Sequence, residues 1–105
     1  MINLDYFKEN YGDDPELIED VLAELIMQLQ EVVMNYPIWF KENNNNMCAD
    51  HAHKMKSSLG YIGHLEGSAL FKEVELKSKS DQISDMLIEE VTRFASELII
   101  EIKKS

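Results

Sequence analysis

The sequence has few of the residues that interrupt helices or cross-link chains. Its 105 residues include 4 glycines, 2 prolines and one cysteine, Cys48. So few turn-forming residues argue against a fold of many short strands. A single cysteine excludes an internal disulfide, which fits a reducing compartment.

Basic residues are also scarce. The 10 Lys and Arg are outnumbered by 20 Asp and Glu, which gives a formal net charge of -10 and an isoelectric point near 4.6. Nucleic acids and anionic membranes bind proteins through basic surfaces, so we expect neither as a partner. The beginning of the chain lacks the basic and apolar regions of a secretory leader, and no apolar run approaches the roughly 20 residues of a membrane span. We therefore expect a cytoplasmic protein whose partner is another protein or a cation.

Apolar residues are plentiful, at 45% of the chain, and they recur at helical intervals. This content lies above the range of disordered chains, and the length suits one domain, which we expect over residues 1–105. The longest pattern predicts a helix that Asp14 caps, that has Pro15 in its first position and that runs to Phe40. Pro37 lies within this pattern, so we expect a kink there without a change of direction.

The rest of the chain predicts further helices. The asparagine run 43–46 is expected to be a loop, because asparagine is unfavourable in helix interiors. A helix over about 47–60 follows, and beyond the glycines that weaken it the helical pattern continues to Ser78. Ser80 or Asp81 is expected to cap the last helix.

These segments together predict an all-α fold. Four amphipathic helices need a shared core, and no alternating strand pattern occurs. We expect an antiparallel four-helix bundle with a short extra N-terminal helix within Leu4 to Glu9. Such a bundle buries its apolar faces within one chain, so a monomer is expected.

The predicted helix over 47–60 carries an unusual polar face. Met55 and Leu59 lie on the side of the helical wheel opposite His53, so His53 is expected to face solvent. The residues within about 60° of His53 are Asp50, Lys56, Ser57, Gly60 and, if the helix extends that far, His64. A histidine surrounded by a lysine and by very small residues is uncommon on a solvated face.

Each of these neighbours has a use if His53 accepts a phosphoryl group. Neutral imidazole is a competent nucleophile at physiological pH. Lys56, one turn further along the helix, is expected to neutralise the phosphoryl oxygens. Ser57 is a small neighbour and a potential hydrogen-bond donor, and Gly60 keeps the surface low enough for a partner to dock over the imidazole.

The stretch 52–63, Ala-His-Lys-Met-Lys-Ser-Ser-Leu-Gly-Tyr-Ile-Gly, resembles the histidine-containing phosphotransfer (HPt) domain of bacterial multistep phosphorelays. That family has Ala-His, an apolar residue, Lys, small residues and a Gly ten positions after the His. The helix entry at Tyr11 to Glu16 and the apolar-acidic pair Val74-Glu75 are also similar to the family, so the resemblance covers nearly the whole chain.

Two residues depart from the family pattern. Ser57 stands where Gly is usual, and its added hydroxymethyl group is expected to slow transfer or alter the choice of partner. Gly67 stands where an apolar core residue is more frequent, which is expected to loosen the start of that helix.

The resemblance implies a phosphocarrier rather than an enzyme with turnover. The implied partners are receiver domains of response regulators and a hybrid sensor histidine kinase. One receiver passes a phosphoryl group from its aspartate to Nε2 of His53, and a second receiver removes it. The receiver is expected to supply Mg²⁺, so no cofactor or metal is expected on this chain. The sequence contains no Walker-type or kinase-type glycine loop, so phosphorylation from ATP is not expected.

Other interpretations remain open at this point. The chain could bind or sequester a receiver domain with His53 unused, or be a helical adaptor for a different partner. His51 lies nearly opposite His53 on the wheel and is expected to be a core or boundary histidine, and His64 is expected to have at most a minor role. Cys48 and His51 are spaced like two metal ligands, but no second pair completes a four-ligand site.

Overall fold

All regular structure in the described part of the chain, residues 4–104, is helical. The structure, a computed structural model, has five helices there: α1 (Asp5–Tyr11), α2 (Pro15–Lys41), α3 (Asn45–Tyr61), α4 (Leu65–Lys79) and α5 (Asp85–Lys104). The molecule has a radius of gyration of 13.9 Å and measures 42 × 22 × 18 Å along its principal axes. The predicted all-α class is confirmed, and the arrangement is consistent with a helical bundle. Between residues 4 and 104, no helix combines the length and apolar character needed to cross a membrane.

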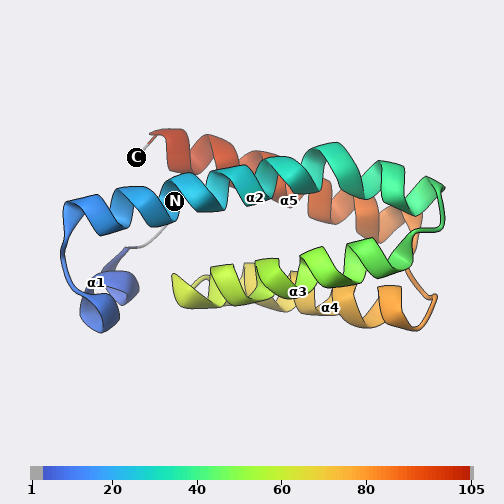
Figure 1. The fold of residues 1–105 in the computed structure, drawn as a ribbon, viewed down its shortest axis with the longest axis horizontal. Helices are drawn as coiled ribbons and strands as arrows, with labels where there is room; N and C mark the ends of the chain where they lie inside the picture. Colours follow the sequence, from blue (N-terminus) through green and yellow to red (C-terminus); the bar gives the residue numbers. More distant parts are fainter. Residues whose placement is uncertain (1–3, 105) are drawn as a thin grey trace.

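The four long helices lie along the long axis of the molecule in two closely packed pairs. α2 packs beside α5, and α3 packs beside α4, while α3 also contacts α2 (Figure 1). The short helix α1 covers one end of this assembly, where Tyr11 stacks on Tyr61 with ring centroids 4.1 Å apart. The N-terminal helix is thus held by aromatic contact with the last residue of α3.

The beginning of α2 follows the sequence expectation. The Asp14 carboxylate accepts the Glu16 backbone N–H at 3.0 Å, and Pro15 occupies the first position, where no amide proton is needed. α2 continues without interruption through Pro37 to Lys41, which confirms one helix across the proline. The kink at Pro37 stays a prediction.

The turns between helices differ from expectation in three places. The predicted loop at 43–46 is wrong in its second half, because Asn45 and Asn46 form the first turn of α3. Asn43 adopts a left-handed conformation, with φ of 56°, in the turn before α3. The helix predicted over about 47–60 is confirmed as α3, but the helical pattern predicted to continue beyond the glycines is interrupted at 62–64, and α4 is a separate helix.

The interruption between α3 and α4 depends on Gly63. Its φ of 77° is a conformation that side chains with a Cβ rarely adopt. A Cβ atom at this position would also lie 2.5 Å from the ring of Tyr6. The glycine therefore permits both the turn and the close approach of α1.

The predicted cap of the last helix is also wrong. Ser84, rather than Ser80 or Asp81, caps α5, since its Oγ accepts the Leu87 N–H at 3.3 Å. Asp81 instead lies in the preceding turn with φ of 56°, and its Oδ1 accepts a hydrogen bond from the Asn45 side chain at 2.9 Å. A capping residue can stand at several positions in such a polar stretch, and packing of the helix selects one of them.

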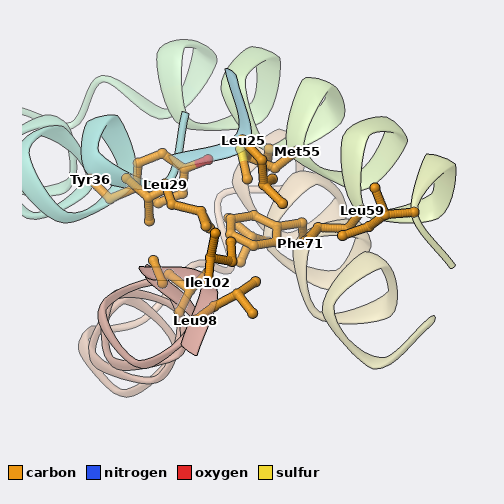
Figure 2. Close-up of a cluster of buried hydrophobic side chains, with 14 of the residues drawn as sticks. Leu25, Leu29, Tyr36, Met55, Leu59, Phe71, Leu98 and Ile102 are labelled. Carbon is orange, nitrogen blue, oxygen red and sulfur yellow. The ribbon is translucent and has the colours of Figure 1, made fainter. Parts of the chain in front are cut away.

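The core lies between the two helix pairs (Figure 2). Its side chains come from every long helix, and burial of their apolar surface is the main source of folding free energy. The labelled members are Leu25, Leu29, Tyr36, Met55, Leu59, Phe71, Leu98 and Ile102.

Gly67 is closely packed at the beginning of α4. A Cβ atom there would lie 2.7 Å from Cζ of Phe94 and 3.0 Å from Cδ1 of Leu59. The Phe94 ring of α5 thus takes the space that a side chain at position 67 would occupy.

Candidate functional site

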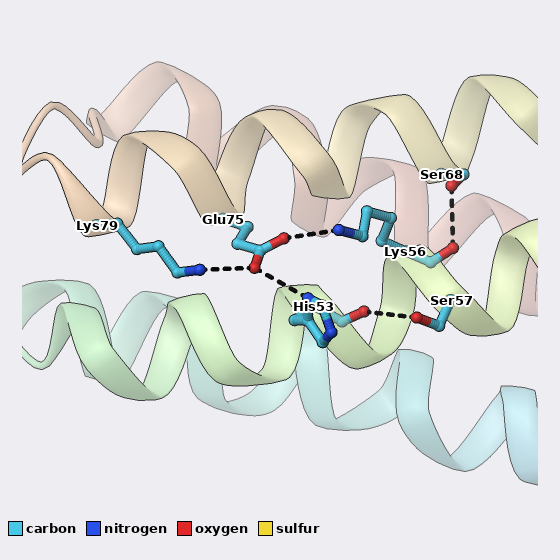
Figure 3. A network of polar contacts seen from close by, with 6 residues as sticks. All are labelled: His53, Lys56, Ser57, Ser68, Glu75 and Lys79. Atoms are coloured by element: carbon cyan, nitrogen blue, oxygen red, sulfur yellow. Dashed lines mark hydrogen bonds and ion pairs between the residues drawn. The ribbon is translucent and has the colours of Figure 1, made fainter.

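His53 lies near the middle of α3, and its side chain is 59% exposed, as its helical position predicts. Its Nδ1 atom is 3.0 Å from Oε2 of Glu75, a residue of the neighbouring helix α4 (Figure 3). The imidazole is therefore open to solvent on one side and hydrogen-bonded to α4 on the other.

Glu75 is the centre of this site. Its side chain is only 6% exposed and lies among the buried positions Phe71, Val74 and Ser78 of α4. Lys56 donates to its Oε1 at 3.1 Å, and Lys79 donates to its Oε2 at 2.9 Å (Figure 3). A buried carboxylate requires such partners, because desolvation of an unpaired charge costs several kcal/mol.

These contacts determine the charge of Glu75. Hydrogen bonds from Lys79, then from Lys56 and His53, lower the pKa of Glu75 from its usual value near 4.5 to about 2, although burial acts in the opposite direction. At physiological pH Glu75 is thus a carboxylate that can only accept hydrogen bonds.

The charge of Glu75 in turn assigns the proton on His53. Because the carboxylate only accepts, Nδ1 of His53 carries the proton in the 3.0 Å hydrogen bond. The lone pair of the neutral ring is then on Nε2, which lies on the side of the ring away from Glu75 (Figure 3). In its neutral form, the exposed ring therefore has Nε2, and not Nδ1, as its unprotonated nitrogen.

The structure places the other predicted residues around His53 with different contacts. Lys56 is 29% exposed and its ammonium group is bound to Glu75 beside the imidazole, so its role toward phosphoryl oxygens stays a prediction. The Ser57 hydroxyl donates to the His53 backbone carbonyl at 3.2 Å. Gly60 is half-buried, and a Cβ atom there would lie 3.7 Å from Ser68 Oγ of α4, so its role in an open docking surface stays a prediction.

One further contact shows how α3 and α4 are joined. Ser68 Oγ of α4 donates to the Lys56 carbonyl of α3 at 2.9 Å, close to the ion pair of Lys56 with Glu75 (Figure 3). Side-chain hydrogen bonds thus join α3 to α4 at His53 and, one turn later, at Lys56.

The other two histidines have structural contacts. His51 is buried, and its Nδ1 lies 2.8 Å from the Tyr36 hydroxyl, which confirms a core histidine satisfied by a neighbour. His64 lies beyond the end of α3 and caps α4, where its Nδ1 accepts the Gly67 N–H at 3.0 Å.

Cys48 is buried, and burial raises the pKa of its thiol to about 11. Among residues 4–104, no group of three or more His, Cys, Asp and Glu side chains is arranged to hold a metal ion.

Sequence reasoning did not find the roles of Glu75 and Lys79. Glu75 was named only as part of the family resemblance, and Lys79 was not among the predicted site residues. A signal was present, because Glu75 falls within the apolar face formed by Phe71, Val74 and Ser78, with Lys79 one turn later. A glutamate at a core position needs a cationic partner, and the sequence offers one at this spacing.

An open apolar groove lies beside the site. It has a volume of about 430 Å³ and runs between α2 and α3. Ser57, one turn from His53, belongs to its lining, and Asp20 and Glu24 add acidic groups from α2. The complete lining is Asp20, Val21, Glu24, Leu25, Gln28, Ser57, Ser58 and Tyr61.

Comparison with models of known protein families, with curated proteins and with solved structures gives no match for this chain. The motif around His53 and the geometry of its contacts are therefore the basis for a function.

Proposed function

We propose that this protein is a histidine phosphotransfer protein of a two-component phosphorelay. His53 Nε2 carries a phosphoryl group between the aspartates of receiver domains. The observation that supports this most is the exposed imidazole whose Nδ1–H is held by the buried Glu75 carboxylate, which leaves the Nε2 lone pair toward solvent.

The proposal includes the architecture and the setting of the protein. The four long helices form an antiparallel four-helix bundle with α1 as the short extra helix, and the pairing of α2 with α5 and of α3 with α4 supports it. The protein acts in the cytoplasm as a monomer. Its partners are response-regulator receiver domains and a hybrid sensor histidine kinase, without nucleic acid or membrane. The apolar groove beside Ser57 suits a protein partner that docks over His53.

The reaction is a reversible transfer between two carriers. Nε2 of His53 attacks the phosphorus of the receiver's aspartyl phosphate, an N–P bond forms, and the P–O bond to the aspartate breaks to release its carboxylate. Nδ1 keeps its proton throughout, and Glu75 faces the positive charge that the phosphorylated ring acquires. Lys56 lies beside the ring, where it neutralises phosphoryl charge in the docked complex.

The protein needs no metal of its own in this proposal, because the partner receiver brings Mg²⁺. Transfer then depends on position and on charge, which the arrangement of His53, Glu75 and Lys56 provides.

The decisive experiment follows radiolabelled phosphate from phosphorylated receiver domains to this protein. Wild type is expected to acquire acid-labile, alkali-stable label, and His53→Gln is expected to acquire none. His51→Gln is the matched control, since it changes the histidine two positions away on the opposite face of α3, and it is expected to be labelled. Label of the same kind in His53→Gln would contradict the assignment.

The apolar groove fits one alternative equally well, an adaptor that binds or sequesters a receiver without phosphorylation. That function predicts receiver binding without label, and equal signalling by wild type and His53→Gln in cells. The same labelling experiment, with receiver binding measured in parallel, therefore separates the two functions.

A further inference from the structure

Two donors share one oxygen atom of Glu75. Lys79 Nζ lies 2.9 Å from Oε2, and His53 Nδ1 lies 3.0 Å from the same atom, while Lys56 binds the other oxygen. Lys79 stands one turn after Glu75 on α4, and its side chain is 59% exposed. Lys79 and His53 thus compete for the negative charge of a single carboxylate oxygen (Figure 3).

We propose that Lys79 is a positioning residue that acts on His53 through Glu75. By sharing Oε2, it weakens the hold of the carboxylate on the Nδ1–H of His53 and keeps the ring neutral, with a free lone pair on Nε2, down to a lower pH. Only the consequence for phosphoryl acceptance depends on the proposed function.

The charge near the ring depends on Lys79. Glu75 contributes one negative charge, and Lys56 and Lys79 contribute two positive charges, so these three groups carry a net charge of +1. Without Lys79 the net charge becomes zero, and Oε2 accepts from His53 alone. A carboxylate with fewer donors stabilises an imidazolium more strongly, and an imidazolium has no lone pair for nucleophilic attack.

Other charged groups near His53 stay unchanged in this comparison. On α3 these are Asp50, Lys54 and Lys56, and on α4 the facing group is Glu75, while Asp20 and Glu24 of α2 line the groove that reaches Ser57. Among the hydrogen bonds and ion pairs of residues 4–104, the His53 ring contacts Glu75 only. Lys79 Nζ and His53 Nδ1 contact the same oxygen atom, so the two groups are close. Loss of the Lys79 charge is therefore expected to shift the titration midpoint of the ring by about 0.5 pH unit or more.

The chain offers a matched control on the same helix. Lys77 pairs with Glu73 at 3.2 Å in the same i,i+4 arrangement, with both side chains about half exposed. Lys77→Met removes the same charge from α4 without touching Glu75. Lys79→Arg keeps a cation at the proposed position.

The first test is a pH titration of the His53 ring nitrogens by ¹⁵N nuclear magnetic resonance. Lys79→Met is expected to move the titration midpoint of these nitrogens about 0.5 pH unit or more above that of wild type. Lys77→Met and Lys79→Arg are expected to titrate within about 0.2 pH unit of wild type. A Lys79→Met curve that coincides with wild type, or an equal shift in Lys77→Met, would overturn the proposal.

The second test uses phosphoramidate, a small phosphoryl donor, in which the P–N bond breaks, ammonia leaves and a bond forms between phosphorus and Nε2. Lys79→Met is expected to accept phosphoryl about threefold more slowly than wild type near pH 6 and equally fast near pH 8.5. A uniform loss at every pH would indicate a structural role and would overturn the proposal. If receivers fail to label any variant, the proposed function fails, whereas the ¹⁵N titration still decides the role of Lys79.

Discussion

The two histidines near the middle of α3 differ in every property that matters for chemistry. His51 is buried against α2, with Nδ1 at 2.8 Å from the Tyr36 hydroxyl and Nε2 at 3.7 Å from a Glu31 carboxylate oxygen. His53, two residues later, is exposed and bound through Nδ1 to Glu75 of α4. The same residue type on the same helix therefore meets two different partner helices.

The partners assign opposite tautomers to the two rings. The Tyr36 hydroxyl lies 2.8 Å from Nδ1 of His51 and can donate or accept, but the Glu31 carboxylate near Nε2 favours a proton on Nε2, so that Tyr36 donates to Nδ1. His51 then carries its proton on Nε2, toward Glu31. Burial, followed by the nearby Lys54 charge, lowers the pKa of His51 against the opposing effect of Glu31, so the ring is held neutral. His53 has the reverse arrangement, with the proton on Nδ1 and the lone pair exposed.

The largest expected difference between the two faces is in chemical reactivity. Diethylpyrocarbonate acylates unprotonated imidazole nitrogens, and it is expected to modify His53 at least about 100-fold faster than the buried His51. Peptide mapping by mass spectrometry, at reagent concentrations that leave the fold intact, measures both rates. Comparable rates at the two residues would mean that α3 does not separate a buried face from an open one.

The next effect concerns stability, where substitution of His51 is expected to have a larger effect than substitution of His53. His51→Ala removes a buried side chain and leaves the Tyr36 hydroxyl without its partner, so it is expected to lower the free energy of unfolding by about 2–4 kcal/mol. His53→Ala is expected to cost less than about 1 kcal/mol, because Glu75 keeps both lysines. Urea denaturation of both variants gives the comparison, and equal losses would contradict it.

A smaller effect is expected from pH on the α4 side. The pKa of Glu75 is lower in the folded protein, about 2, than its usual value near 4.5, so the unfolded chain binds the proton more readily. The contribution of Glu75 is therefore complete above about pH 4.5 and is lost as the pH falls toward about 2. Glu75→Gln lacks the ionisable carboxyl group and therefore this pH-dependent contribution. The difference in unfolding free energy between wild type and the variant is expected to shrink by roughly 1–3 kcal/mol as the pH falls from about 4.5 to about 2. A difference independent of pH would show that Glu75 is not held as a carboxylate.

The smallest effect tests the hydrogen bond of the buried histidine. Tyr36→Phe keeps the ring of a fully buried side chain and removes only the hydroxyl that donates to His51. It is expected to cost about 1 kcal/mol in unfolding free energy, measured by thermal or urea denaturation. The ¹⁵N signals of His53 are expected to stay unchanged, and a change in them would show that the two faces are coupled.

Much of the local structure could be predicted from short stretches of sequence. The capped start of α2, its continuation through Pro37, and the opposite placement of His51 and His53 all follow from residue spacing within one helix. The ends of helices were less predictable. Asn45 joined α3, and Ser84 instead of an earlier residue capped α5, because packing selects one end among several that the local sequence allows.

The sequence by itself determined an acidic, helix-forming chain and an exposed histidine with small neighbours and a nearby lysine. Only the tertiary structure decided which nitrogen of His53 faces solvent, because the residue that assigns the proton, Glu75, lies 22 positions away on another helix. Packing of α3 against α4 brings the two together, and burial makes the carboxylate depend on Lys56, Lys79 and His53 as partners. A helical pattern specifies which face a residue occupies, but the residue that meets it there is set by how two helices align.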